Sequence, residues 1–84
     1  MIEEDFVVKK PLGLHIRVVS EFVNIVSKYK SDIKIFKDDQ LADGKSPMDI
    51  LTLIVLPGDK IKVIVDGEDE KELISVVREF FNKE

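Results

Sequence analysis

Residues 60–81 read KIKVIVDGEDEKELISVVREFF, and they hold the two clearest structural signals in the chain. The apolar residues Ile61, Val63 and Val65 alternate with Lys60, Lys62 and Ile64, and this alternation predicts a strand. Apolar residues then recur at helical spacing over residues 73–81, which predicts an amphipathic helix. The acids at 68–72 suit the positive end of the helix dipole, so we interpret them as a solvated helix start rather than a metal site.

The same criteria divide the rest of the chain into short elements. We predict strands at 6–8, 33–36 and 41–42 and a helix at 16–29, where polar residues recur every three or four positions. Helical periodicity should outweigh the many β-branched residues there, because packing of the apolar face supplies most of a helix's stability. A second, short helix should begin at Ser46, a hydroxyl N-cap that is followed by Pro47 at the first helical position.

The length and the order of elements predict a fold class. With 84 residues the chain has room for one small domain, which we place at residues 1–84. The order is strand, helix, strand, strand, helix, strand, helix. This order predicts an α+β open-faced sandwich, in which the helices cover one face of the sheet and solvent covers the other.

Composition excludes several classes of function. Lys and Arg number 13 against 17 Asp and Glu, a net charge of −4 that argues against non-specific nucleic-acid binding and docking on anionic membranes. Cysteine is absent, so disulfides and thiolate zinc sites are excluded. The longest apolar run, residues 53–56, is far too short to span a membrane. The acidic first residues are unlike a signal peptide, and we expect a cytoplasmic protein.

The only histidine, His15, directly precedes the predicted 16–29 helix. Unpaired N–H groups and the dipole make a helix N-terminus favourable for a bound anion. Arg17 lies in the first turn, where a cation opposes the dipole unless an anion is present. A neutral imidazole is a nucleophile that can carry a phosphoryl group, and Arg17 could stabilise the charge of that group. The alternative is that His15 is an ordinary loop residue at a helix start.

Two motifs resemble those of a known family. Residues 13–17, GLHIR, are similar to the Gly-Leu-His-Ala-Arg-Pro-Ala signature of HPr, the histidine-containing phosphocarrier family of the bacterial phosphotransferase system. Lys45, Ser46 and Met48 resemble that family's second signature, around a regulatory serine. The Pro57–Gly58 turn, the 61–65 strand and the acidic start of the last helix also match the family's spacing, so the resemblance covers nearly the whole chain.

The resemblance implies both a structure and an activity. The structure is a four-stranded antiparallel sheet with three helices on one side. The activity is that of a carrier without turnover of its own: His15 accepts a phosphoryl group on Nδ1 from phosphoenolpyruvate-charged enzyme I and donates it to an enzyme IIA domain, with Arg17 as the neighbouring cation. In some bacteria a kinase, HPr kinase/phosphorylase, also phosphorylates the serine corresponding to Ser46. No metal or organic cofactor is implied.

We expect partners to dock in succession on an apolar surface beside His15, formed by Ile16, Pro47, Met48 and Leu51, on a monomeric carrier. Ile16 and Val18 stand where the family signature has alanine and proline. These departures leave open an HPr-like regulatory protein that acts by binding, through phosphorylation of Ser46 rather than transfer through His15. A more distant alternative is an α+β domain without phosphate chemistry.

Overall fold

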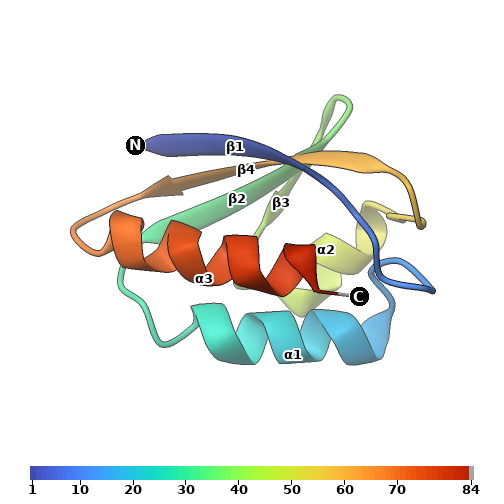
Figure 1. Cartoon of the computed structure of the whole chain (residues 1–84), viewed down its shortest axis with the longest axis horizontal. Coiled ribbons are helices and arrows are strands. Elements are labelled where there is room, and N and C mark those ends of the chain that lie inside the picture. The colour runs from blue at the N-terminus through green and yellow to red at the C-terminus, as the bar shows by residue number, and fades with distance from the viewer. Residues whose placement is uncertain (84) are drawn as a thin grey trace.

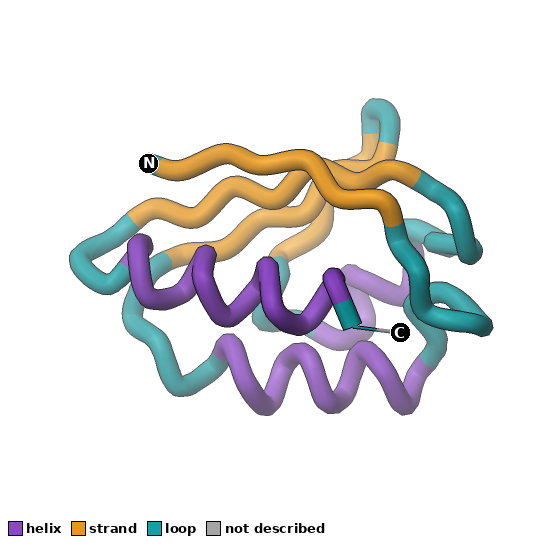
Figure 2. Tube along the Cα trace, in the orientation of Figure 1, coloured by secondary structure: helices purple, strands orange, loops and turns teal. Residues whose placement is uncertain are grey.

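Four strands form one antiparallel sheet in the computed structural model, which describes residues 1–83. The elements in chain order are β1 (Ile2–Val7), α1 (Ile16–Val26), β2 (Asp32–Lys37), β3 (Gln40–Asp43), α2 (Pro47–Thr52), β4 (Lys60–Asp66) and α3 (Glu70–Asn82). The strand order is β1-β4-β2-β3, and all three helices lie on the same face of the sheet (Figures 1 and 2). The predicted α+β open-faced sandwich is therefore confirmed.

Strand alternation directs one set of side chains towards the helices. In the sheet register Val63 of β4 lies between Glu4 of β1 and Ile35 of β2, and both Val63 and Ile35 are fully buried. Burying a side chain of this size contributes about 1.5–3 kcal/mol, so the alternating pattern fixes which face of each strand packs. The outward positions of the same strands carry most of their charged side chains.

An aromatic cluster joins the helices to β1. The ring centroid of Phe81 on α3 lies 5.3 Å from that of Phe6 on β1 and 5.4 Å from that of Phe22 on α1. Phe80 packs edge-on against Phe22 at 5.2 Å. Such pairs add to the stabilisation from buried area, so this cluster helps to hold α1 and α3 against each other and α3 against the sheet.

The predicted ends of all four strands differ from those in the structure. The first strand begins at Ile2 rather than at residue 6, because Glu3 and Asp5 occupy outward positions of the strand while the side chain of Glu4 pairs with Arg78 at 2.8 Å. Its predicted last residue, Val8, lies beyond the strand, although it is buried and bonded to residues 58–59. The strands predicted at 33–36, 41–42 and 61–65 each extend by one or two residues.

Helix α1 ends at Val26 rather than at the predicted residue 29. The N–H of Tyr29 donates to the carbonyl oxygen of Val26 at 3.1 Å, a three-residue spacing that tightens the chain after the last helical turn. Tyr29 still packs against the core. The helix therefore gives way to a turn without exposing the last apolar side chain of the periodic stretch.

Asp69 links two loops at the end of the molecule where α1 stops and α3 starts. Its carboxylate accepts hydrogen bonds from the N–H groups of Lys30 and Ser31, both at 2.8 Å, and from the Ser31 hydroxyl. These donors, the hydroxyl first, lower the pKa of Asp69 to about 2. Gly67 approaches Ser31 so closely that a Cβ there would lie 2.5 Å from the Ser31 hydroxyl oxygen.

Candidate functional site

His15 occupies the N-cap position of α1, at the opposite end of that helix from the Asp69 link (Figure 1). Its backbone is extended, with φ −89° and ψ 173°, and its carbonyl oxygen accepts the first helical hydrogen bond, 2.9 Å from the N–H of Val19. The half-buried imidazole makes no capping bond to the helix. The first-turn N–H groups of Ile16, Arg17 and Val18 thus have no partner within α1, and an anion beside His15 could accept from them.

The loop before His15 is fixed against the segment that follows α2. The N–H of Leu14 donates to the carbonyl oxygen of Val55 at 3.0 Å, and the Leu14 side chain is buried. Gly13 has φ +70°, and a Cβ at this position would lie 2.9 Å from the Cα of Leu56. Only glycine combines this conformation with this close approach, so Gly13 and Leu14 hold His15 in one place at the helix start.

The segment after α2 is in turn held from the sheet side. The ammonium group of Lys37 donates to the carbonyl oxygen of Ile54 at 2.6 Å and forms an ion pair with Asp59 at 3.0 Å. The Asp59 carboxylate also accepts from the N–H of Leu56 at 2.9 Å. That N–H, followed by Lys37, lowers the pKa of Asp59 below its ordinary value, so the carboxylate keeps its charge to a lower pH than an unperturbed aspartate.

The charges around His15 favour the binding of an anion. No acidic side chain lies in the first turn of α1, whereas Glu70 and Glu72 occupy the first turn of α3. Arg17 is exposed and forms no ion pair with any residue of the 1–83 range. A cation that opposes the helix dipole and has no carboxylate partner gains most when an anion lies next to it.

Ser46 is the N-cap of α2, as predicted. Its hydroxyl oxygen accepts a hydrogen bond from the N–H of Asp49 at 3.4 Å, and Pro47 takes the first helical position. The neighbouring Lys45 is directed away from the serine, because its ammonium group donates to the carbonyl oxygen of Tyr29 at 2.7 Å. Asp43 also lies close by, since its N–H contacts the Asp49 carboxylate at 3.4 Å. The Asp49 carboxylate thus joins the start of α2 to the end of β3.

The predicted docking residues differ in exposure. Ile16 and Met48 are 60% and 71% exposed, whereas Pro47 and Leu51 are half-buried and Leu51 packs partly against the core. Helices α1 and α2, which carry these four residues, pack against each other. Sequence reasoning missed three further exposed apolar residues on the loops that adjoin His15: Leu12, Ile54 and Leu56.

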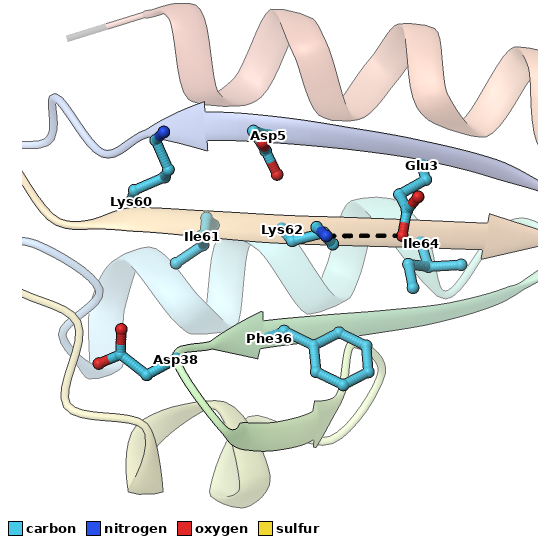
Figure 3. A pocket seen from close by; sticks show the side chains of 8 residues that line it. All are labelled: Glu3, Asp5, Phe36, Asp38, Lys60, Ile61, Lys62 and Ile64. Atoms are coloured by element: carbon cyan, nitrogen blue, oxygen red, sulfur yellow. Dashed lines mark ion pairs between the residues drawn. The ribbon is translucent and has the colours of Figure 1, made fainter.

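A hollow of about 440 Å³ lies away from this site, on the open face of the sheet (Figure 3). Its lining mixes both signs of charge with Phe36 and Ile64, and Lys62 forms an ion pair with Glu3 at 3.7 Å across it. None of its lining residues belongs to a helix or to the His15 loop. Within residues 1–83 no group of three or more acids and histidine is placed to hold a metal ion.

None of the described helices is both long and apolar enough to cross a membrane.

A family model described as the PTS HPr component phosphorylation site matches residues 2–83. The chain is 30% identical over 82 residues to the phosphocarrier protein HPr of Neisseria meningitidis, covering 98% of this chain and 92% of that one. It is 33% identical over 84 residues to the HPr-like protein Crh of Halalkalibacterium halodurans, with both chains fully covered. The crystal structure of HPr from Thermoanaerobacter tengcongensis superposes with a TM-score of 0.86 at 34% identity, covering 100% of this chain and 99% of that one.

Proposed function

Because the chain belongs to the HPr family of phosphocarrier proteins of the phosphotransferase system, we propose that His15 carries the phosphoryl group. In this proposal His15 accepts the group from phosphoenolpyruvate-charged enzyme I and passes it to an enzyme IIA domain. One observation carries the assignment: the only histidine lies at the N-terminus of α1, beside Arg17, which forms no ion pair with residues 1–83, and without acids in the first turn.

The transfer needs a nucleophile and groups that stabilise the negative charge of the transferred phosphoryl group. The Nδ1 atom of a neutral imidazole attacks the phosphorus, a P–N bond forms, and the bond to the donor breaks with its electron pair left on the donor. The new group brings a charge of about −2. Arg17 and the free first-turn N–H groups stabilise that charge, and the reverse sequence of bond changes delivers the group to the acceptor.

A carrier must also release what it holds. His15 is only half-buried and Arg17 is exposed, so water screens both and keeps the stabilisation of the phosphoryl group modest. The protein itself supplies no independent turnover in this account. Enzyme I and the IIA domain complete the reaction on either side, and a transient complex with each of them suits a surface of ordinary size.

Incubation with phosphoenolpyruvate and active enzyme I of the same organism, followed by intact-mass analysis, tests acceptance by His15. We expect one acid-labile phosphoryl group on the wild type and none on His15→Ala. Failure of the wild type to gain the group, with an enzyme I that phosphorylates a control carrier, would refute the proposal.

A second candidate function is regulation by binding. It is supported by the full-length match to a protein named HPr-like protein Crh, and by Ile16 and Val18 in the first turn of α1. In this case HPr kinase/phosphorylase phosphorylates Ser46, and the modified chain binds a target protein. Incubation with ATP and that kinase distinguishes the two functions: regulation predicts incorporation that Ser46→Ala abolishes and His15→Ala leaves intact.

Partners dock on Ile16, Pro47, Met48 and Leu51, and the protein acts in the cytoplasm without a cofactor, nucleic acid or membrane. We propose a monomer, because an open docking surface must admit donor and acceptor in turn. Similar solved structures include an HPr dimer from Thermoanaerobacter tengcongensis, with a TM-score of 0.69, so sedimentation velocity at working concentration is the measurement that tests the monomer.

A further inference from the structure

An isoleucine stands in left-handed conformation just beyond the C-cap of α2. Leu53 is the C-cap, and Ile54 after it has φ +52°. Helices commonly end in one left-handed residue at this position, but that residue is usually glycine and sometimes asparagine. A β-branched residue there is an outlier, because its Cβ is crowded by the backbone.

Hydrogen bonds hold this strained residue from several sides. The N–H of Ile54 donates to the carbonyl oxygen of Leu51 at 3.3 Å, and its own carbonyl oxygen accepts from Lys37 at 2.6 Å. On the next two residues, Val55 accepts from Leu14 and Leu56 donates to Asp59. The segment therefore cannot relax by rotating locally, which is the condition under which backbone strain persists in a folded protein.

Core packing does not explain why isoleucine occupies this position. The Ile54 side chain is 67% exposed, so a glycine or asparagine would satisfy the backbone without leaving a cavity. Strained residues cluster at binding and catalytic sites, where a side chain contributes something other than stability. An exposed apolar side chain in a strained conformation thus points to a contact that forms only when a partner is present.

The location of Ile54 links that contact to the loop that carries His15. The bond between Leu14 and Val55 joins its segment to the loop that carries His15. Five of the eight exposed large apolar residues of the 1–83 range lie on the loops and helix starts around His15: Leu12, Ile16, Met48, Ile54 and Leu56. A protein interface covers about 800 Å² per partner, a disc of about 16 Å radius, which is wide enough for a protein that binds at His15 to extend over the adjoining segment with Ile54.

We propose that Ile54 is a specificity-determining contact for the protein that delivers the phosphoryl group, phosphorylated enzyme I. This inference rests on the proposed carrier function. The occupant must present an apolar surface to Ile54 and Leu56, because Lys37 and Asp59 below them neutralise each other and offer no free charge. The left-handed backbone serves to aim an apolar side chain at the partner.

Two substitutions test the proposal: Ile54→Gly and Ile54→Asn, which both suit a left-handed residue and both remove the apolar side chain. The measurement is phosphoryl transfer from phosphorylated enzyme I at varied concentrations of the carrier. We expect KM to rise about fivefold or more in each variant, which is typical of removing an interface side chain that contributes substantially to binding. The kcat should stay near the wild-type value, because His15 and its loop are untouched, and Tm should not fall, because strain is relieved.

Two matched variants control for indirect effects. Leu41→Ala removes a side chain that is 53% exposed on the outer strand β3, and Asp38→Gly relaxes the other non-glycine residue with positive φ. Both should leave KM unchanged.

The inference would be overturned if both Ile54 variants had the wild-type KM. It would also be overturned if KM rose as much in Leu41→Ala as in the Ile54 variants. A dimer of the wild type that Ile54→Asn dissociates in sedimentation would assign the contact to a second copy and overturn it as well. Absence of transfer to the wild type would instead refute the carrier function.

Discussion

The N–H of Leu14 lies 3.0 Å from the carbonyl oxygen of Val55, and this hydrogen bond joins the start of α1 to the segment after α2. The bond matters because it makes the position of His15 depend on residues some forty positions further along the chain. Gly13 lets the two backbones approach, and Lys37 and Asp59 hold the far side of the segment. The proposed phosphoryl acceptor is thus positioned by loops, on a rigid scaffold of sheet and helices.

Gly13→Ala should disrupt this arrangement. A Cβ would meet the backbone of Val55 and Leu56, and alanine disfavours φ +70°. We expect a loss of at least about 2 kcal/mol in the free energy of unfolding, measured by urea denaturation, and slower phosphoryl acceptance by the folded fraction. Gly58→Ala is the matched control, because Gly58 has positive φ but open space around it, so it should lose stability without slowing transfer. Equal transfer rates for the two variants would contradict the role given to Gly13.

Arg17→Gln should separate function from stability. Loss of the charge beside the transferred group should slow acceptance by His15 about tenfold, the worth of one charge-assisted hydrogen bond. The same change should raise the free energy of unfolding by a few tenths of a kcal/mol, because a cation that opposes the helix dipole is removed.

Quench-flow transfer kinetics and denaturation curves measure the two effects of Arg17→Gln. Arg17→Lys keeps the charge and should recover part of the rate. An unchanged rate in Arg17→Gln would exclude Arg17 from the site.

Ser46→Ala should destabilise the protein by about 0.5–1 kcal/mol, because α2 loses its N-cap hydrogen bond. The 3.4 Å length of that bond favours the lower end of the range. Ser46→Asn retains a capping oxygen and should keep most of the stability. Thermal unfolding of the three proteins checks the order; no difference between alanine and asparagine would mean that the cap contributes nothing.

Acid should weaken the Asp69 link in a definite pH window. The pKa of Asp69 is lowered from 3.8 to about 2 by the Ser31 hydroxyl and the N–H groups of Lys30 and Ser31. A carboxyl with a lowered folded pKa contributes stability that is full above 3.8 and disappears as the pH falls to about 2.

Asp69→Asn should therefore be less stable than the wild type at neutral pH, with the difference narrowing below pH 3.8. Urea unfolding of both proteins across this pH range measures the effect. A constant difference at all pH values would show that the Asp69 charge is not responsible.

The sequence predicted the elements whose signal is local. Ser46, Pro47 and Asp49 lie within four positions, so the start of α2 could be identified from hydrogen-bonding preferences alone. The periodic stretch from Ile16 identified α1, and with it the place of His15 at a helix start. The acids of β1 hid the first part of that strand, which was predicted only from residue 6, because Glu3 and Asp5 face solvent while the strand pairs with β4.

What the sequence could not predict depends on contacts between distant residues. The bonds from Leu14 to Val55 and from Ser31 to Asp69 join loops far apart in the chain, and no short motif announces either. The left-handed conformation of Ile54 could not be predicted either, because a left-handed residue after a helix is usually glycine or asparagine, and isoleucine is disfavoured there. The apolar surface around His15 was consequently expected to be smaller than it is.

The most direct test of the central claim follows the phosphoryl group through the chain. The wild type is charged with enzyme I and phosphoenolpyruvate, purified, and mixed with an enzyme IIA domain from the same organism, with intact mass read on both proteins. We expect one group to leave this chain as one appears on the IIA domain, and His15→Ala neither to gain nor to pass a group. A group that stays on the wild type, or one that His15→Ala still acquires and transfers, would contradict it.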